Sequence, residues 1–304
     1  MVLILGACTG VPKSSNATDD RFGVLLMAHG GEPEWNAGVL SAVEPLRDRY
    51  VIEVAFGMAD PATIQEAVAR LEGQGITRIG VVRLFVSGES WYERTEQILG
   101  IEEGAPPRRT ANEHAREASH HGHGMELWRI DTSAAFALST EGLADAEEME
   151  AVLADRAQTL SRDPENEDVL VLAHGPGDDR ENERWIATIQ ERARAIEARL
   201  PFRRVAVATL REDWPEKRKK AERRIRAFVD RATEEGGTAL VIPFRVYGFG
   251  PYARVLQGLD YVSDGRGLIP HRNVTRWIAK QIKALEDARF ESATAEAQAG
   301  RWPR

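Results

Sequence analysis

Val24–Gly31, VLLMAHGG, and Val169–Pro176, VLVLAHGP, share one pattern in this sequence: an apolar run that ends abruptly in Ala-His-Gly. A continuous apolar run bounded by glycine is typical of a strand buried on both faces, as in a parallel sheet covered by helices. His29 and His174 then stand at the carboxyl ends of strands, where open α/β sheets place their ligand crevices. The sequence therefore predicts two strands that each deliver an imidazole to such a crevice.

After the first of these stretches, segments with a helical pattern and segments with a strand pattern alternate along the chain. Apolar spacing predicts a helix over Glu34–Tyr50, and a second helix begins at Pro61 and ends near Gly73. Apolar runs predict strands at Val51–Phe56 and Arg78–Val86. This β-α-β-α order is typical of a doubly wound parallel sheet.

The second half of the chain repeats the same order. Helices are predicted at Asn182–Leu200 and Glu216–Arg231, and strands at Arg204–Leu210 and Ala239–Val246. An internal repeat of this size indicates duplication of a whole lobe rather than a solenoid. The expected fold class is therefore α/β, with two similar lobes, each a mainly parallel sheet flanked by helices.

The pattern also suggests where the lobes begin and end. Residues 1–20 are interpreted as a leader and tether, residues 21–127 as the N-terminal lobe, and residues 128–304 as the C-terminal lobe. A polar insertion at residues 102–124 interrupts the first lobe.

This insertion holds four of the seven histidines of the chain: His114, His120, His121 and His123. A short histidine-rich tract can collect metal ions. The alternative is a solvated loop whose histidines are merely polar, and this alternative is favoured because long loops are often weakly specific. We therefore expect any metal binding by the tract His114–His123 to be accessory.

Composition and charge exclude some classes of function. Hydrophobic residues make up 42% of the 304 residues and charged residues 29%, as in ordinary globular proteins. The formal net charge of −8 argues against a general nucleic-acid binder, which needs a basic surface. The basic run Lys217–Arg226 is interpreted as a solvated helix face. No apolar run approaches the ~20 residues of a membrane span.

The single cysteine, Cys8, excludes an internal disulfide framework. Leu5–Cys8, LGAC, resembles the lipobox of bacterial lipoproteins, in which the cysteine is lipidated. The apolar segment before it is short and lacks a basic residue, so this interpretation treats Met1 as an internal start within a longer leader. Two localisations stay open: a lipid-anchored extracytoplasmic protein, or a cytoplasmic protein with a frayed apolar N-terminus.

Glu89 follows the predicted strand Arg78–Val86 and can join His29 at one rim of the sheet. An imidazole and a carboxylate can ligate a divalent ion and accept protons. Two ligands are too few for a closed structural zinc site, so they favour a site that holds a metal loosely. In the second half Phe249 stands at the position that matches Glu89. We therefore expect His174 to lack a carboxylate partner and the first lobe to hold the working site.

The sequence resembles the CbiX/SirB-type sirohydrochlorin chelatases in three features. These are the AHG-terminated strand, the duplicated arrangement, and the segment at residues 59–87, ADPATIQEAVARLEGQGITRIGVVRLFVS. This family inserts cobalt or iron into a tetrapyrrole without ATP. The resemblance implies a metal site with one histidine after the first strand and another after the LFVS-type strand. The first carries over to His29. The second falls near Glu89, where the family usually has histidine, and Arg83 stands where the family commonly has proline.

The resemblance implies Co²⁺ or Fe²⁺ as a substrate, a tetrapyrrole partner and no nucleotide. Insertion requires two pyrrole protons to leave, and His29 and Glu89 are the candidates for holding the metal and accepting those protons. Sirohydrochlorin carries many carboxylates. Arg83, Arg245 and Arg254 lie at or just after strand ends and are candidates for binding them. The alternative for these arginines is a surface or interlobe ion pair.

Two other functions compete with metal insertion. A non-catalytic extracytoplasmic lipoprotein that binds a metal or a tetrapyrrole would account for Cys8, the histidine-rich tract and the missing second histidine. A hydrolase or phosphatase on the same fold is less favoured, because the sequence lacks a G-x-S-x-G elbow and a P-loop.

Overall fold

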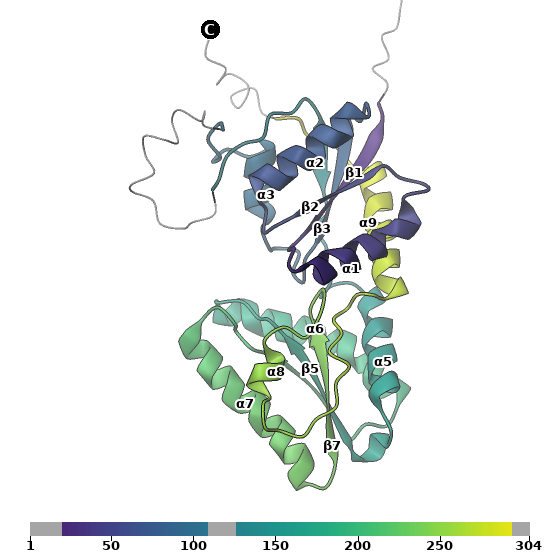
Figure 1. Ribbon diagram of the computed structural model, residues 1–304, viewed down its shortest axis with the longest axis vertical. Coiled ribbons are helices and arrows are strands. Elements are labelled where there is room, and N and C mark those ends of the chain that lie inside the picture. Colours follow the sequence, from purple (N-terminus) through teal and green to yellow (C-terminus); the bar gives the residue numbers. More distant parts are fainter. Residues whose placement is uncertain (1–19, 109–125, 294–304) are drawn as a thin grey trace, which may run out of the picture.

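The computed structural model describes residues 20–108 and 126–293. These residues form two lobes, each built on a parallel sheet (Figure 1). The first sheet has the strand order β2-β1-β3-β4, with β1 at Phe22–Ala28, β2 at Ile52–Phe56, β3 at Arg78–Leu84 and β4 at Ala135–Leu138. The second sheet has the order β6-β5-β7, with β5 at Glu167–Ala173, β6 at Arg204–Thr209 and β7 at Thr238–Phe244. The predicted two-lobed α/β class is confirmed.

Helices connect the strands in both lobes. The first lobe has α1 (Pro33–Val43) with a 3₁₀ turn η1 (Glu44–Leu46), α2 (Pro61–Gly73) and α3 (Tyr92–Leu99). The second has α5 (Glu148–Leu160), a 3₁₀ turn η2 (Pro164–Asn166), α6 (Asp179–Arg199), α7 (Pro215–Glu234) and α8 (Tyr252–Val255), and α9 (Arg272–Glu286) follows. Local signals explain the start of α2: Pro61 supplies the fixed φ of a first helical residue, and the Asp60 carboxylate accepts a hydrogen bond from the Ala62 N–H.

The apolar side chains of each sheet alternate between two faces, and each face has its own helices. In the first lobe α2 and α3 cover one face, and α1 and α9 cover the other. In the second lobe α7 and α8 cover one face, and α5 and α6 cover the other. The strands at the centre are buried on both sides, as their continuous apolar runs indicate.

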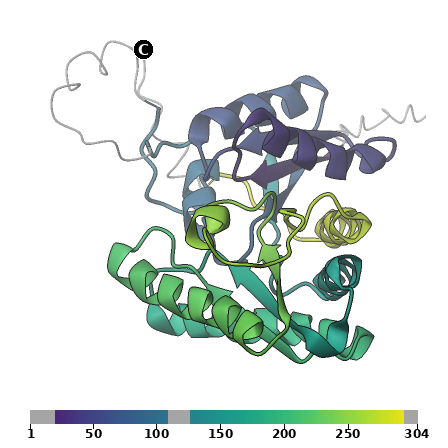
Figure 2. The ribbon, with the colours of Figure 1, turned by 60° about the horizontal axis from the view of Figure 1, so that its bottom comes forward.

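Helix α9 joins the lobes although it comes last along the described chain. It packs on β3 and α1 of the first lobe and also against α5 of the second (Figures 1 and 2). Trp277 and Ile278 of α9 are fully buried in a core that includes residues of both lobes, such as Val82 and Val171. The two lobes therefore share one continuous hydrophobic core.

The predicted boundary between residues 127 and 128 needs correction. Strand β4 pairs in parallel with β3, with Arg78 opposite Ala135, so this segment belongs to the first sheet. Phe136 also exchanges backbone hydrogen bonds with Glu291, near the end of the described chain. Along the chain, the second lobe thus lies between two segments that belong to the first: β4 adds a strand to the first sheet, and α9 covers one face of that sheet.

Some predictions fall outside the described residues. Cys8, its lipobox and the tract His114–His123 all lie there. Within the described ranges, no helix is both long enough and apolar enough to cross a membrane.

Candidate functional site between the lobes

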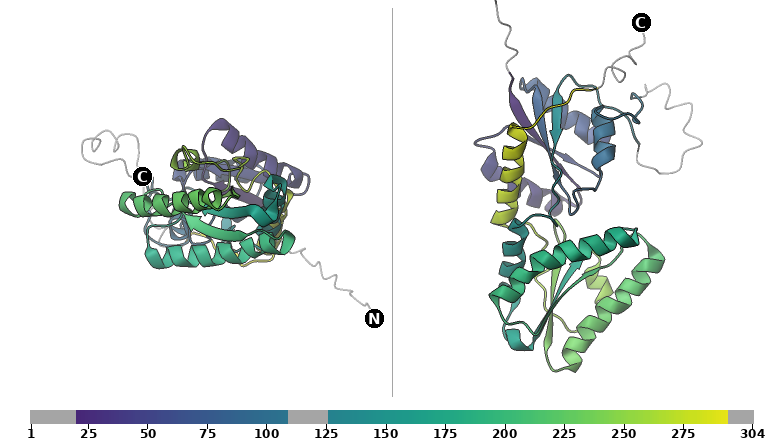
Figure 3. Two further views of the ribbon diagram at one scale, coloured as in Figure 1. Left: turned by 90° about the horizontal axis from the view of Figure 1, so that it is seen from below. Right: turned by 180° about the vertical axis from the view of Figure 1, so that it is seen from behind.

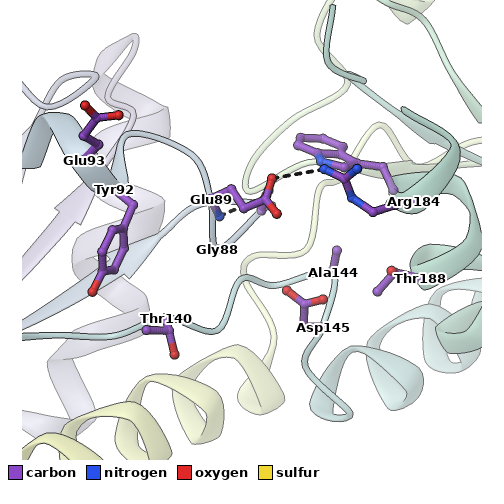
Figure 4. Close-up of a pocket in the computed structure, with 11 residues that line it drawn as sticks. Gly88, Glu89, Tyr92, Glu93, Thr140, Ala144, Asp145, Arg184 and Thr188 are labelled. Atoms are coloured by element: carbon purple, nitrogen blue, oxygen red, sulfur yellow. Dashed lines mark hydrogen bonds and ion pairs between the residues drawn. The ribbon is translucent and has the colours of Figure 1, made fainter. Parts of the chain in front are cut away.

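A pocket of about 700 Å³ lies where the loops after the first sheet meet α6 of the second lobe (Figure 4). Glu89 and Glu93 border it from the loop and helix that follow β3, and Asp145 from the segment after β4. Arg184, Trp185 and Thr188 of α6 line the opposite wall. Glu89 Oε2 lies 3.4 Å from Arg184 Nη2, and this ion pair spans the two lobes.

Three carboxylates and one guanidinium give this pocket an excess of negative charge. The side chains of Glu89 and Arg184 are 70% and 60% exposed, so their ion pair contributes little to stability. Such a pair can open when a ligand enters. An acidic pocket attracts a divalent cation better than it attracts a ligand rich in carboxylates.

The loop that carries Glu89 packs against the segment after β4. A Cβ on Gly88 would lie 1.9 Å from the Thr140 carbonyl oxygen, so no side chain fits there without moving the loop. The Ser87 hydroxyl accepts a hydrogen bond from the Glu89 N–H at 3.1 Å. These contacts fix the Glu89 backbone although its side chain is exposed.

Arg83 belongs to this support and does not bind carboxylates of a ligand, which corrects the prediction. The side chain is 1% exposed, and its nitrogens donate to the carbonyl oxygens of Ser139, Ser90 and Gly88. Its guanidinium also lies over the Tyr92 ring, 4.4 Å from the centroid. Burial lowers the pKa of Arg83 to about 10, so the group stays charged at neutral pH. Arg83 therefore ties the Glu89 loop to the end of β4.

His29 follows β1 directly and is exposed. Its Nδ1 lies 2.8 Å from the carbonyl oxygen of Gly30, and its ring is 6.2 Å from the ring of Trp35. His29 and Glu89 thus lie beyond the carboxyl ends of adjacent strands, because Ala28 of β1 pairs with Leu84 of β3. His29 is nevertheless not among the residues that line the pocket.

His174 was expected to lack a carboxylate partner, and this prediction is wrong. Its Nδ1 lies 3.3 Å from Glu212 Oε2, and its Nε2 lies 3.2 Å from Asp213 Oδ2. Both carboxylates follow β6, the neighbour of β5, so they reach the imidazole across the carboxyl edge of the sheet. Phe249, at the position that matches Glu89 in the first half, stacks on Tyr261.

The Glu212 carboxylate is held firmly. Its side chain is only 14% exposed, and its Oε1 accepts a hydrogen bond from Arg245 Nη1 at 2.6 Å. Burial alone would raise the pKa of Glu212, but His174 and Arg245 lower it below its usual value. Glu212 is therefore an ionised carboxylate that orients the His174 ring, while Asp213, at 70% exposure, is open to solvent.

The two remaining predicted arginines differ from each other. Arg245 forms an ion pair with Glu212 and lies over the Tyr252 ring. Its guanidinium therefore stabilises the second lobe and is not available to bind a carboxylate of a ligand. Arg254, on α8, is exposed. The acidic pair Glu212 and Asp213 was missed, although Asp and Glu directly after an apolar strand are the same signal that identified Glu89.

A tryptophan lies beside each strand-end histidine. The ring of Trp214 is 6.1 Å from that of His174. The Trp214 ring also packs against Gly177, where an added Cβ would lie 2.3 Å from the indole. Trp214 is 36% exposed. Each lobe therefore presents an imidazole and an indole at the carboxyl end of its first strand. Among the described residues, no group of three or more histidine, cysteine, aspartate and glutamate side chains is arranged to chelate a metal ion.

Two parallel sheets, with a pocket where the strand-end loops of the first meet α6 of the second lobe, define a two-lobed α/β protein whose fold resembles that of SirB. The chain is similar to SirB from Bacillus subtilis, solved with Fe³⁺, with a TM-score of 0.60 and 15% identity over 88% of this chain and 96% of that one.

A second similar structure is DR2241 from Deinococcus radiodurans, a multi-domain protein described as structurally similar to chelatases. It has a TM-score of 0.48 and 17% identity, over 92% of this chain and 58% of that one. No family model and no curated protein sequence matches the chain.

Proposed function

We propose that this protein inserts a divalent metal ion, Co²⁺ or Fe²⁺, into sirohydrochlorin or a related carboxylated tetrapyrrole, without a nucleotide. The observation that carries the proposal is the contact of His174 with Glu212 and Asp213 at the carboxyl edge of a parallel sheet. The fold shared with SirB, a structure that contains Fe³⁺, supports the same chemistry.

The interlobe pocket supports entry of the metal. Its negative charge attracts a divalent cation, and Glu89 provides an exposed hard oxygen ligand. His29 lies beyond the adjacent strand and is exposed, and because its Nδ1 contacts the Gly30 carbonyl oxygen, Nε2 is the nitrogen assigned to ligate the metal. We assign the loose binding of the metal substrate to His29 and Glu89.

Removal of the pyrrole protons is assigned to His174. Hydrogen bonding of Nδ1 to an ionised Glu212 orients the ring and stabilises the imidazolium that forms when the ring accepts a proton. Asp213 beside Nε2 can pass the proton on to solvent, because its side chain is mostly exposed. Trp214 offers an exposed aromatic face beside the same imidazole, suited to a planar macrocycle.

The test is metallation of sirohydrochlorin by Co²⁺ or Fe²⁺, followed by absorbance, in single variants. We expect His29→Ala and Glu89→Gln to raise the metal concentration needed for half-maximal rate. His174→Ala should lower kcat about 100-fold or more, in the range of a lost general base. Glu212→Gln should also lower kcat, but less than His174→Ala does, because the imidazolium loses its counter-charge.

Matched controls separate these effects from general damage. Glu197→Gln changes an exposed carboxylate on α6, and His271→Asn keeps a side chain that can cap α9. Both controls should metallate at the wild-type rate. Wild-type rates in folded His29→Ala and His174→Ala would refute the site assignment. A wild-type protein that binds metal or tetrapyrrole tightly but never metallates would favour the alternative, a non-catalytic binding protein.

A further inference from the structure

A second groove, of about 580 Å³, runs along the outer edge of β6, between α6 and α7. Figure 3 (right) shows the second lobe, with these two long helices, from behind. Among the described residues β6 pairs only with β5, and five of its six residues are only partly buried. An edge strand of this kind presents a row of backbone N–H and C=O groups without sheet partners. Apolar side chains, including Val207, Ile225 and Phe228, line the groove beside this edge.

The α7 wall of the groove is basic. Lys217, Lys220 and Arg224 line it, at a spacing of three and four residues that places them on one helix face. Lys217 is paired with Asp179. Lys220 and Arg224 are exposed and have no ion-pair partner within the described part of the chain. Because the whole chain carries a net charge of −8, this is a local concentration of positive charge.

We propose that this groove binds an extended acidic segment of a partner protein, which adds to β6 as a further strand. The backbone of the segment would satisfy the open edge of β6, the usual basis of strand addition. Side chains alternate along a strand, so acidic residues facing α7 would meet Lys220 and Arg224 while small apolar residues face Ile186 of α6. The favoured sequence therefore alternates acidic and apolar residues.

A second copy of this chain is a poorer occupant of the same edge. Pairing of β6 with its symmetry mate would bring two basic α7 faces together, and like charges at close range are destabilising. An acidic segment has the complementary charge. The inference does not depend on metal insertion, because Lys220 and Arg224 lie outside the interlobe pocket.

The probe is a fluorescein-labelled peptide of four glutamates alternating with three valines, measured by fluorescence anisotropy at low salt. Its basic counterpart, with lysine for glutamate, should bind at least 10-fold more weakly. Lys220→Glu combined with Arg224→Glu should weaken the acidic peptide at least 10-fold. Lys219→Glu combined with Arg223→Glu makes the same charge change on the same helix outside the groove, and should have little effect. Both double variants should metallate like wild type.

Backbone pairing is tested on the peptide, which avoids damage to β6. N-methylation of all valines, or of all glutamates, removes the backbone donors on one edge of the peptide. One of the two methylated peptides should bind at least 10-fold more weakly than the parent. If the two methylated peptides bind equally well, the peptide does not add to β6 as a strand. If the two double variants weaken binding of the acidic peptide equally, the peptide does not bind in the groove. Sedimentation tests the second copy as an occupant. If the wild-type protein self-associates and the double variant Lys220→Glu with Arg224→Glu does not, the edge of β6 binds a second copy instead.

Discussion

Asp168 shows how a single residue position links charge to the stability of this fold. Its side chain is fully buried near the start of β5, where Arg203 Nε and Nη2 donate to its two oxygens at 2.8 and 2.9 Å, and Arg204 also contacts it. Burial alone would raise the pKa of Asp168, but the hydrogen bonds from Arg203 and Arg204 lower it further than burial raises it. The ionised Asp168 carboxylate is therefore stabilised more in the folded protein than in the unfolded chain.

This depressed pKa predicts a pH-dependent loss of stability. A carboxyl whose pKa is lower in the folded state contributes stability above its unfolded pKa, near 4, and loses it as pH falls through the folded pKa. Asp168→Asn should thus be clearly less stable than wild type at pH 7. The difference between the two proteins should shrink below about pH 4. Urea unfolding at several pH values measures this, and a difference that stays constant down to pH 2 would contradict it.

Arg83 predicts a second effect at the residue scale. Arg83→Met keeps much of the side-chain volume but leaves the carbonyl oxygens of Ser139 and Gly88 without their donors. We expect a loss of roughly 2–3 kcal/mol in the free energy of unfolding, typical of hydrogen bonds to a charged group. Arg223→Met, on an exposed arginine, should change stability little. A neutral effect of Arg83→Met in urea unfolding would show that the guanidinium does not hold the loop.

The residue scale is also where the sequence was least informative. The end of each strand could be recognised, so the positions of His29, Glu89 and His174 at strand ends were predictable. Which carboxylate would reach which imidazole was not, because Glu212 approaches His174 from a strand that lies beside β5 only in the folded sheet. The inward direction of Arg83 has a related cause, since one of its acceptors, the Ser139 carbonyl oxygen, comes from a segment 56 residues away along the chain.

At the scale of elements, the turn between β5 and α6 requires a glycine at position 175. Gly175 has φ of +80°, and a Cβ there would lie 2.5 Å from Thr209 Cβ. Gly175→Ala should cost roughly 1–3 kcal/mol from backbone strain and more from the clash. Gly236→Ala is the matched control, because it has a similar φ of +75° but open space around it. Equal losses in the two variants would show that the contact with Thr209 does not matter.

Most elements were predictable because each carries its own pattern. Apolar runs identify strands buried on both faces, helical spacing identifies α1 and α7, and the proline at its start identifies α2. The assignment of β4 to a lobe was not predictable in this way. A short apolar strand of four residues, AFAL, fits either sheet, and only its pairing with β3 decides between them.

For the whole molecule, the shared core predicts that both lobes unfold together. Trp277 of α9 is fully buried, and its Nε1 donates to Glu141 Oε2 at 3.0 Å. Trp277→Ala should lower the free energy of unfolding by roughly 3–5 kcal/mol, as for other buried large-to-small changes. Wild type and variant should each unfold in one transition, coincident by circular dichroism and fluorescence. Two separate transitions would show that the lobes are independent.

The position of α9 also matters during synthesis of the chain. The ribosome makes the first four strands early, but the helix that covers one face of the first sheet emerges only after the whole second lobe. Until then only α1 covers that face, and apolar side chains of β3 such as Val82 and Leu84 lack the contacts with α9. The first lobe therefore cannot complete its folding before the second lobe has been synthesised, and nascent chains that stop before residue 272 should be clients for chaperones that bind exposed apolar strands.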